Sequence, residues 1–146
     1  MEREGKAVLI GEYQHTIDTK GRLIMPARFR DDLGNHFIIT KGLDNCLFVY
    51  SLTEWAVLEE RIRALPLSQA RDLQRFFFSG AAEAEVDRQG RILIPAHLRE
   101  YAAITKDIVI NGALVRAEIW NKEKWQNQNS ALTSDRIAEA MEKIGF

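Results

Sequence analysis

The sequence predicts an α+β fold built from a duplicated half-domain, on three observations. The stretch Asp18–Pro26, of sequence DTKGRLIMP, returns 69 residues later as Asp87–Pro95, of sequence DRQGRILIP. Each copy sits between strand-like residues and a short helical pattern. The 146-residue chain can bury an ordinary core, whereas half of it would be marginal alone. We therefore expect two copies of one unit packed on each other.

The likeness between the copies extends past the motif, at an offset that changes from 69 to 70 residues. The matching positions are Ala27 with Ala96, Arg30 with Arg99, Lys41-Gly42 with Asn111-Gly112, and Trp55 with Trp125. One inserted residue accounts for the change. Two copies are too few for a solenoid of stacked repeats, so the pattern indicates a duplicated half-domain.

The first copy reads as strand, turn, strand and helix. Expected elements are extended segments at 7–11 and 13–17, a turn at 18–21, a strand at 22–25, a helix at 26–33 closed by Gly34, and two strands between 37 and 50 around a turn at 42–45. Aspartate tolerates turn geometry and glycine supplies a positive φ. Leu23, Ile24 and Met25 form a continuous apolar run, which predicts a strand buried on both faces. Pro26 is pre-set for the start of a helix.

A helical hairpin is expected to close the first half. Ser51 and Glu54 have the spacing of a capping box, and the helix that follows should end at Leu65-Pro66. Ser68 is expected to cap a second helix that runs to about Ser79. Trp55 in the first helix and the single Cys46 before it are interpreted as core residues.

The second copy repeats the order of the first. Expected elements are a strand at 81–86, a turn at 87–90, a strand at 91–94, a helix at 95–102, a hairpin over 108–120, a helix capped by Asn121 that carries Trp125, and a last helix from about 135 with Ile137, Met141 and Ile144 on one face. Asn111-Gly112 predicts the tight turn of the hairpin. Residues 126–130 fit either a loose joint or a continuous helix.

Charge is locally basic although the net charge is only −1. In the first copy Lys20, Arg22, Arg28 and Arg30 stand against Asp18, and in the second Arg88, Arg91 and Arg99 stand against Asp87. No global field draws the chain to nucleic acid, so a basic function must be local. The repeated stretches are two basic islands.

The motif has a structural interpretation and a functional one. Asp18 and Asp87 are expected to order the turns with Gly21 and Gly90, by pairing across the turn or accepting its N–H groups. One carboxylate cannot neutralise the cations around it. Arginine suits phosphates and guanine edges, and a two-stranded ribbon fits a major groove. Arg22 and Arg91 are therefore the first candidates for contact with double-stranded DNA, Lys20 and Arg88 at the turn tips come next, and Arg28, Arg30 and Arg99 are either further contacts or ordinary helix-surface charges.

Other functional classes find little support. His15, His36 and His97 lack metal-ligand spacing, and there is no phosphate-binding glycine loop and no Ser-His-Asp pattern. We expect no enzyme activity, metal, cofactor or small-molecule substrate. No apolar run is long enough to span a membrane, and the N-terminus carries acidic residues where a signal peptide is basic, so a cytoplasmic location is expected.

The doubled Asp-x-x-Gly-Arg motif, the phrase Gly11–Arg22 and the closing Glu118–Trp120 resemble the MraZ family of transcriptional regulators. The resemblance reaches to about Trp125. It implies two tandem SpoVT-AbrB units with swapped hairpins in a double-split β-barrel-like core with peripheral helices. It also implies a bacterial, nucleoid-associated regulator that forms homo-oligomeric rings and binds DNA repeats upstream of the division and cell-wall gene cluster containing its own gene. The family's DNA contacts carry over to Asp18, Arg22, Asp87 and Arg91.

The expected organisation is unit 1 at 11–55, a connecting helical hairpin at 56–80, unit 2 at 83–125 and a helical tail at 126–146. Two alternatives to a DNA-binding repressor stay open. One is an antitoxin-like module whose tail binds a partner protein. The other is a structural ring whose basic turns pair with acidic neighbours. Antitoxins of this superfamily usually carry one motif, whereas this chain carries two.

Overall fold

The computed structural model describes residues 7–146, so the expectation for the acidic N-terminus falls outside it. The strands in that range are β1 (Glu12–Thr16), β2 (Arg22–Ile24), β3 (His36–Lys41), β4 (Leu47–Ser51), β5 (Ala82–Glu85), β6 (Arg91–Leu93), β7 (Asp107–Gly112) and β8 (Ala117–Asn121). The helices there are α1 (Ala27–Leu33), η1 (Leu43–Asn45), α2 (Leu52–Arg63), α3 (Leu67–Leu73), η2 (Gln74–Phe78), α4 (Ala96–Tyr101), α5 (Lys122–Ser130) and α6 (Ser134–Glu142).

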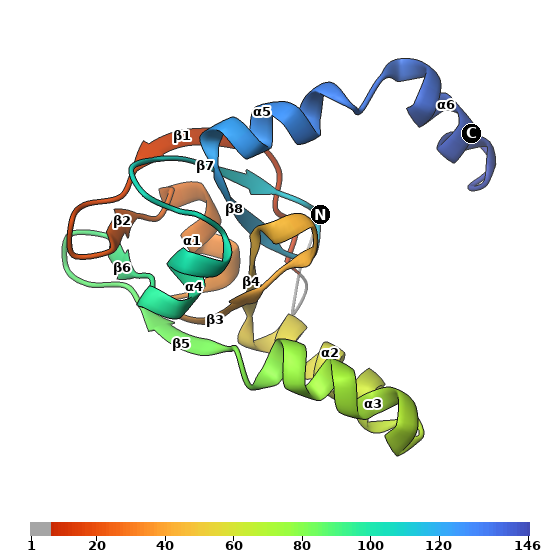
Figure 1. The fold of residues 1–146 in the computed structure, drawn as a ribbon, viewed down its shortest axis with the longest axis horizontal. Coiled ribbons are helices and arrows are strands. Elements are labelled where there is room, and N and C mark those ends of the chain that lie inside the picture. The colour runs from red at the N-terminus through yellow and green to blue at the C-terminus, as the bar shows by residue number, and fades with distance from the viewer. Residues whose placement is uncertain (1–6) are drawn as a thin grey trace.

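The repeats exchange strands. One antiparallel sheet has the order β1-β7-β8-β4-β3-β5, and a second consists of β2 and β6. Thus β1 of the first copy pairs with β7 of the second, while β5 of the second pairs with β3 of the first. The expected α+β fold of two duplicated units is confirmed, and the two units are interleaved (Figure 1).

One hydrophobic core joins both copies. Helices α1 and α4 bury equivalent residues, Phe29 at 1% exposure and Leu98 at 0%. Met25 and Ile94, just after β2 and β6, are both fully buried in the same cluster. Residues of each copy therefore fill the interior of the other, and neither half has a core of its own.

A second, aromatic cluster lies where β4 and β8 meet the helices. Cys46, Phe48, Tyr50 and Trp120 are buried there, with Trp55 and Trp125 partly buried at its margin. Cys46 packs as a small apolar residue, and its thiol donates to the carbonyl of Leu43. Burial raises the pKa of this thiol far above its ordinary value, so it is not a nucleophile near neutral pH. The core interpretation is right for Cys46 and partly right for Trp55.

The expected Asn-Gly turn is wrong. Asn111 and Gly112 end β7, opposite Glu118 and Ala117, and the chain reverses over residues 113–116. A Cβ on Gly112 would lie 2.4 Å from the carbonyl carbon of Leu9, so glycine serves here for close backbone approach. The ladders also make Lys41, opposite Leu47, the counterpart of Gly112, which shifts the expected alignment by one residue.

Helix starts were predicted well where a side chain caps the helix. The Ser51 hydroxyl accepts from the Glu54 N–H, and the Asn121 side chain accepts from the Lys124 N–H. Ser68 is not the cap: the N-cap of α3 is Pro66, two residues earlier, and its fixed φ suits the start of a helix. The helical alternative holds for 126–130, and the joint lies instead between α5 and α6.

One strand residue, Ile24, was expected to be buried and is not. Ile24 is 51% exposed and its counterpart Leu93 is 54% exposed. Only the alternate residues, Leu23 and Ile92, face the core at 1% exposure. The β2–β6 ladder therefore has one solvent-exposed face, which the continuous apolar run in the sequence did not predict.

Because the repeats share one core, we predict a single cooperative unfolding transition. Phe29→Ala in the first copy should lower the free energy of unfolding by roughly 3–5 kcal/mol, and Leu98→Ala in the second copy should lower it by roughly 2–5 kcal/mol. Urea titrations followed by circular dichroism and tryptophan fluorescence should give coincident curves for both variants. Arg28→Ala, at an exposed position of α1, is the control and should change stability by less than about 0.5 kcal/mol. Two separate transitions in either variant would contradict a shared core.

Candidate nucleic-acid interface

Each Asp-x-x-Gly-Arg motif folds into a closed turn. The Asp18 N–H donates to the Arg22 carbonyl at 2.8 Å, and the Gly21 N–H donates to the Asp18 carbonyl at 3.0 Å. The Asp18 carboxylate accepts from the main-chain N–H groups of Lys20 and Arg22 at 3.0 and 2.9 Å. Its other oxygen accepts from Arg22 Nε at 2.9 Å. One carboxylate thus fixes both the turn and the arginine that follows it.

The second turn has the same geometry. The Asp87 carboxylate accepts from the main-chain N–H groups of Gln89 and Arg91, each at 2.9 Å, and from Arg91 Nε at 2.9 Å. The main-chain N–H of Arg91 is the largest cause that holds the pKa of Asp87 below its ordinary value, followed by the Arg91 guanidinium. The Arg22 main-chain N–H lowers the pKa of Asp18 in the same way.

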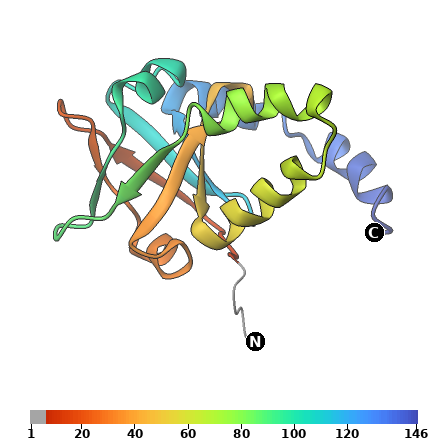
Figure 2. The same cartoon turned by 90° about the horizontal axis from the view of Figure 1, so that it is seen from below.

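The turns lie at the two ends of the β2–β6 ladder. In that ladder Arg22 stands opposite Leu93, and Arg91 stands opposite Ile24. The Met25 N–H donates to the Gly90 carbonyl at 3.0 Å, and the Ile94 N–H donates to the Gly21 carbonyl at 2.8 Å. Each turn is thereby tied to the other copy. Figure 2 shows the two loops projecting from one end of the molecule, away from the α2–α3 hairpin.

The expected hairpin is replaced by a ladder between copies. Strand β1, which precedes the first turn, pairs with β7 and not with β2. The two-stranded ribbon is therefore β2 with β6, one strand from each copy. A local strand–turn–strand pattern predicts that β1 pairs with β2 of the same copy. Instead, each of these two strands pairs with a strand of the second copy.

Arg30 and Arg99 lie behind the turns. The Arg99 Nε donates to the Ile94 carbonyl at 2.9 Å, and a Cβ on Gly21 would lie 2.8 Å from that nitrogen. The Arg30 guanidinium lies correspondingly near Gly90, at 3.5 Å from its Cβ position. These two residues pack against the turn of the other copy, whereas Arg28 is exposed on α1.

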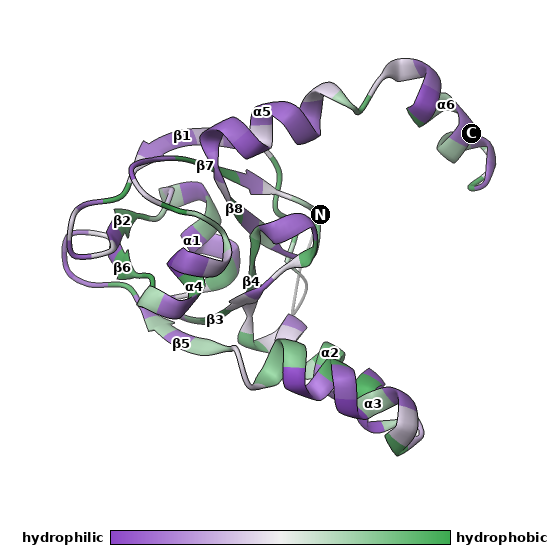
Figure 3. Cartoon of the chain, viewed as in Figure 1, coloured by the Kyte–Doolittle hydropathy of each residue, from purple (hydrophilic) through white to green (hydrophobic). Residues whose placement is uncertain are grey.

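The open face of the ladder combines charge with apolar surface. The side chains of Arg22 and Arg91 are 32% and 29% exposed, and Ile24 and Leu93 lie beside them. Lys20 and Arg88 are exposed in the turns. Figure 3 colours parts of β2 and β6 as hydrophobic between hydrophilic loop segments. Sequence reasoning missed Ile24 and Leu93, although reading every second residue of each strand as outward-facing would have found them.

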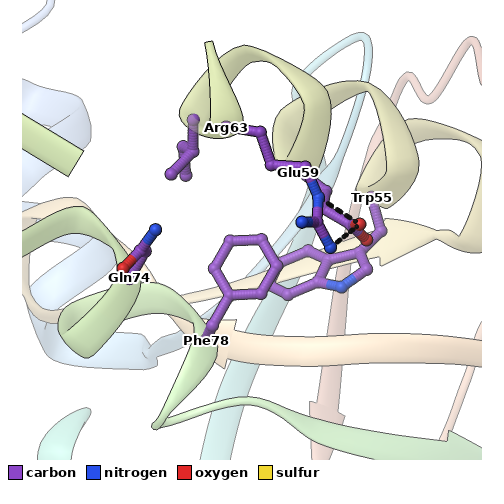
Figure 4. A pocket seen from close by; sticks show the side chains of 6 residues that line it. Trp55, Glu59, Arg63, Gln74 and Phe78 are labelled. Atoms are coloured by element: carbon purple, nitrogen blue, oxygen red, sulfur yellow. Dashed lines mark hydrogen bonds and ion pairs between the residues drawn. The ribbon is translucent and has the colours of Figure 1, made fainter. Parts of the chain in front are cut away.

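An apolar groove of about 320 Å³ lies between α2 and the α3–η2 segment. Trp55 and Phe78 line it with ring centroids 4.4 Å apart, and Glu59 and Arg63 form an ion pair at its rim, 2.9 Å between Oε2 and Nη2 (Figure 4). The charges of the rim thus neutralise each other. Among residues 7–146 no cluster of His, Cys, Asp and Glu could hold a metal ion, and no helix there is long and apolar enough to cross a membrane.

The histidines are separate from one another. His97 Nε2 lies 3.1 Å from the Gly80 carbonyl, and His36 Nε2 lies 3.9 Å from Glu85 Oε1. His15 lies in β1, partly buried. His97 is therefore placed for a hydrogen bond, and His36 is a surface residue.

The fold and the paired turns define a tandem-repeat protein that presents two structurally equivalent basic turns from one end. The family model of the MraZ protein, whose description also carries the words antitoxin-like, matches residues 8–76 and again 77–144. The chain belongs to the MraZ family.

Similar proteins match over nearly the whole chain. A protein named "Transcriptional regulator MraZ" from Caldicellulosiruptor bescii is 56% identical over 143 residues, covering 95% of this chain and 100% of that protein. Proteins of the same name from Heliobacterium modesticaldum and Clostridium beijerinckii are 58% and 57% identical, over 92% and 95% of this chain and 96% and 100% of their own length.

The lowered pKa values of Asp18 and Asp87 predict an acid-sensitive contribution to stability. A carboxylate whose folded-state pKa lies below its unfolded-state value of about 4 stabilises the fold above that pH. Its contribution is lost as pH falls through the folded-state pKa. The stability gap between wild type and Asp18→Asn with Asp87→Asn should therefore be widest near pH 6 and shrink steadily below about pH 4.

Urea midpoints measured across this range check the prediction. The matched control is Asp31→Asn with Asp135→Asn, two exposed aspartates outside the turns. A gap that stays constant with pH would show that the turn carboxylates do not act through their charge.

Proposed function

We propose that this chain is a sequence-specific regulator of transcription that binds double-stranded DNA through its two basic turns. We further propose that it represses the division and cell-wall gene cluster containing its own gene, as a nucleoid-associated, ring-forming homo-oligomer in the cytoplasm. The observation that carries the proposal is the twofold presentation of one arginine-bearing turn on an open strand ladder. The family membership and the names of the relatives support the regulatory role.

The ladder has dimensions that suit a major groove. Arg22 and Arg91 stand two residues out of register across it, which is roughly 7 Å along the strands and about 5 Å between them. Both arginines therefore fit inside one groove about 12 Å wide. In residues 7–146, each of these arginine side chains donates to its aspartate through Nε, so its Nη groups are left as donors for a ligand. Ile24 and Leu93 would supply apolar contact to thymine methyl groups beside them.

The asymmetry of charge supports assembly as part of the function. A net charge of −1 gives a single chain little attraction for DNA. A closed ring repeats each basic face, so several modest contacts act at a high effective concentration. Helix α6 and the turn after it offer a surface for assembly, because Ile137 and Met141 of the helix and Ile144 of the turn form a stripe with 43%, 39% and 66% exposure. The same stripe would also serve the second candidate, an antitoxin-like module that binds a partner protein.

The turn arginines are predicted to carry DNA recognition. Anisotropy of a labelled duplex from the region upstream of this gene should show preference over random duplex, and Arg22→Lys with Arg91→Lys should reduce that preference, because lysine lacks the planar fork of arginine. Each lost bidentate base contact is worth about 1–3 kcal/mol, or roughly 5- to 150-fold in affinity. Weak, non-specific binding should remain because the charge is kept. Wild-type affinity should fall with salt at a slope of about 0.9 per phosphate contacted.

Arg61→Ala with Arg71→Ala removes two exposed positive charges from the α2–α3 hairpin and serves as the control. Its preference for the upstream duplex should equal that of wild type. If wild type shows no preference, or the arginine variant binds as wild type does while folded, the turns are architectural and DNA recognition through them is wrong.

The apolar stripe of α6 is predicted to hold the oligomer together. Ile137→Glu with Met141→Glu should reduce the sedimentation coefficient of the assembly, because two charges would enter an apolar contact. Arg136→Gln with Ala140→Glu makes the same change of charge at the same spacing on a neighbouring face of the helix and should leave the assembly intact. A wild-type monomer, or equal behaviour of the two variants, would favour a partner protein as the occupant of α6 or no occupant.

A further inference from the structure

The two turns have the same backbone geometry but different side chains at their tips, the two residues between the aspartate and the glycine. Between the aspartate and the glycine the first turn has Thr19-Lys20, whereas the second has Arg88-Gln89. All four residues are exposed. The N–H groups of Lys20 and Gln89 donate to their aspartates at 3.0 and 2.9 Å, so these residues occupy equivalent positions. The difference between the turns therefore lies in the side chains alone.

The equivalence of the turns is part of a pseudo-twofold relation. In the ladder Leu23 faces Ile92 at the centre, and Arg22 and Arg91 lie at equivalent distances on either side. In the large sheet the same relation exchanges β1 with β5 and β4 with β8. A truly symmetric pair of turns would suit a palindromic DNA element, because each half would meet the same side chains. Here the backbone of the two turns is symmetric, but the side chains at their tips differ.

The tips differ in the base edges that they match. Lysine has three donors and no acceptor, which suits the O6 and N7 acceptors of guanine. Glutamine has a donor and an acceptor, which suits the N6 donor and N7 acceptor of adenine. An ammonium group presented to the N6 amino group of adenine would place donor against donor. Lys20 and Gln89 thus differ in base preference and not only in charge.

We propose that Lys20 and Gln89 are specificity-determining residues which make one protomer read a non-palindromic element, with guanine contacted from the first turn and adenine from the second. This inference rests on the proposed function, since it requires that the turns reach base edges. Thr19 precedes Lys20 and Arg88 precedes Gln89, so each would lie against the same half of the element as its neighbour. Arg22 and Arg91 are the same in both turns and contribute equally to the two halves.

The pseudo-twofold relation permits a sharp test. If the tip side chains of the two turns are exchanged, by Thr19→Arg, Lys20→Gln, Arg88→Thr and Gln89→Lys together, the molecule presents the original tips after a half-turn. That exchanged variant has the wild-type charge and should select the wild-type element, because the duplex is simply bound in the opposite direction. Lys20→Gln and Gln89→Lys, which place the same residue at both of these equivalent positions, should instead select different elements.

The experiment is selection from a randomised double-stranded DNA library, with the bound duplexes sequenced, for wild type, Lys20→Gln, Gln89→Lys and the exchanged variant. Lys20→Gln should shift the preference in one half of the element from guanine to adenine, and the ratio of the two affinities should change by roughly 5- to 150-fold. Gln89→Lys should replace adenine by guanine in the other half. The exchanged variant should recover the wild-type element to within a few-fold.

Each outcome supports or overturns the inference. Identical elements for wild type and both single variants would overturn it, because Lys20 and Gln89 would then contact only phosphate. A wild-type element that is palindromic would also overturn it. Failure of the exchanged variant to recover the element, while circular dichroism and sedimentation match wild type, would show that the turns are not equivalent readers. If wild type selects no element, the proposed function itself fails, and this result is distinct from the others.

Discussion

Strand exchange between the two copies is the constraint on which the rest of the structure depends. Because β1 pairs with β7 and β5 pairs with β3, each copy contributes a strand that pairs with a strand of the other copy. A unit of about half the chain could not bury enough apolar surface by itself. Exchange solves this by placing residues such as Met25 and Ile94 in one interior. Within residues 7–146, it also leaves β2 and β6 paired only with each other.

The exposed ladder follows from that exchange. If β2 had paired with β1, each turn would close a separate hairpin, and the two arginines would stand on different ribbons. Pairing of β2 with β6 instead brings Arg22 and Arg91 onto one face and ties each turn to the opposite copy through a main-chain hydrogen bond. Arg30 and Arg99 reinforce the arrangement by packing behind the turn of the other copy. The candidate interface is therefore formed jointly by the two copies of the motif.

The aspartate of each motif orders the turn and also fixes the arginine that is the candidate for ligand contact. An arginine on an exposed strand would lose side-chain entropy on binding a ligand, and a partner that already fixes Nε reduces that cost. Asp18 and Asp87 hold the guanidinium groups and the turn N–H groups together. The structural and functional interpretations of the motif are compatible, because the carboxylate preorganises the arginine that it pairs with. Local basic charge is retained, since each aspartate neutralises only one of several cations.

What the sequence determined by itself is what depends on neighbouring residues. The Asp-x-x-Gly-Arg turn, the caps at Ser51 and Asn121 and the duplication all rest on hydrogen bonds within five residues or on direct comparison of the two copies. The same local reasoning misplaced the Asn111-Gly112 turn and concealed the open face at Ile24 and Leu93. In both cases the deciding partner lies far away in the chain: the Leu9 backbone beside Gly112, and the strand of the other copy beside β2. Which strands pair, and hence which face of the motif meets solvent, was decided only by the tertiary structure, because that choice depends on burial shared by segments some 70 residues apart.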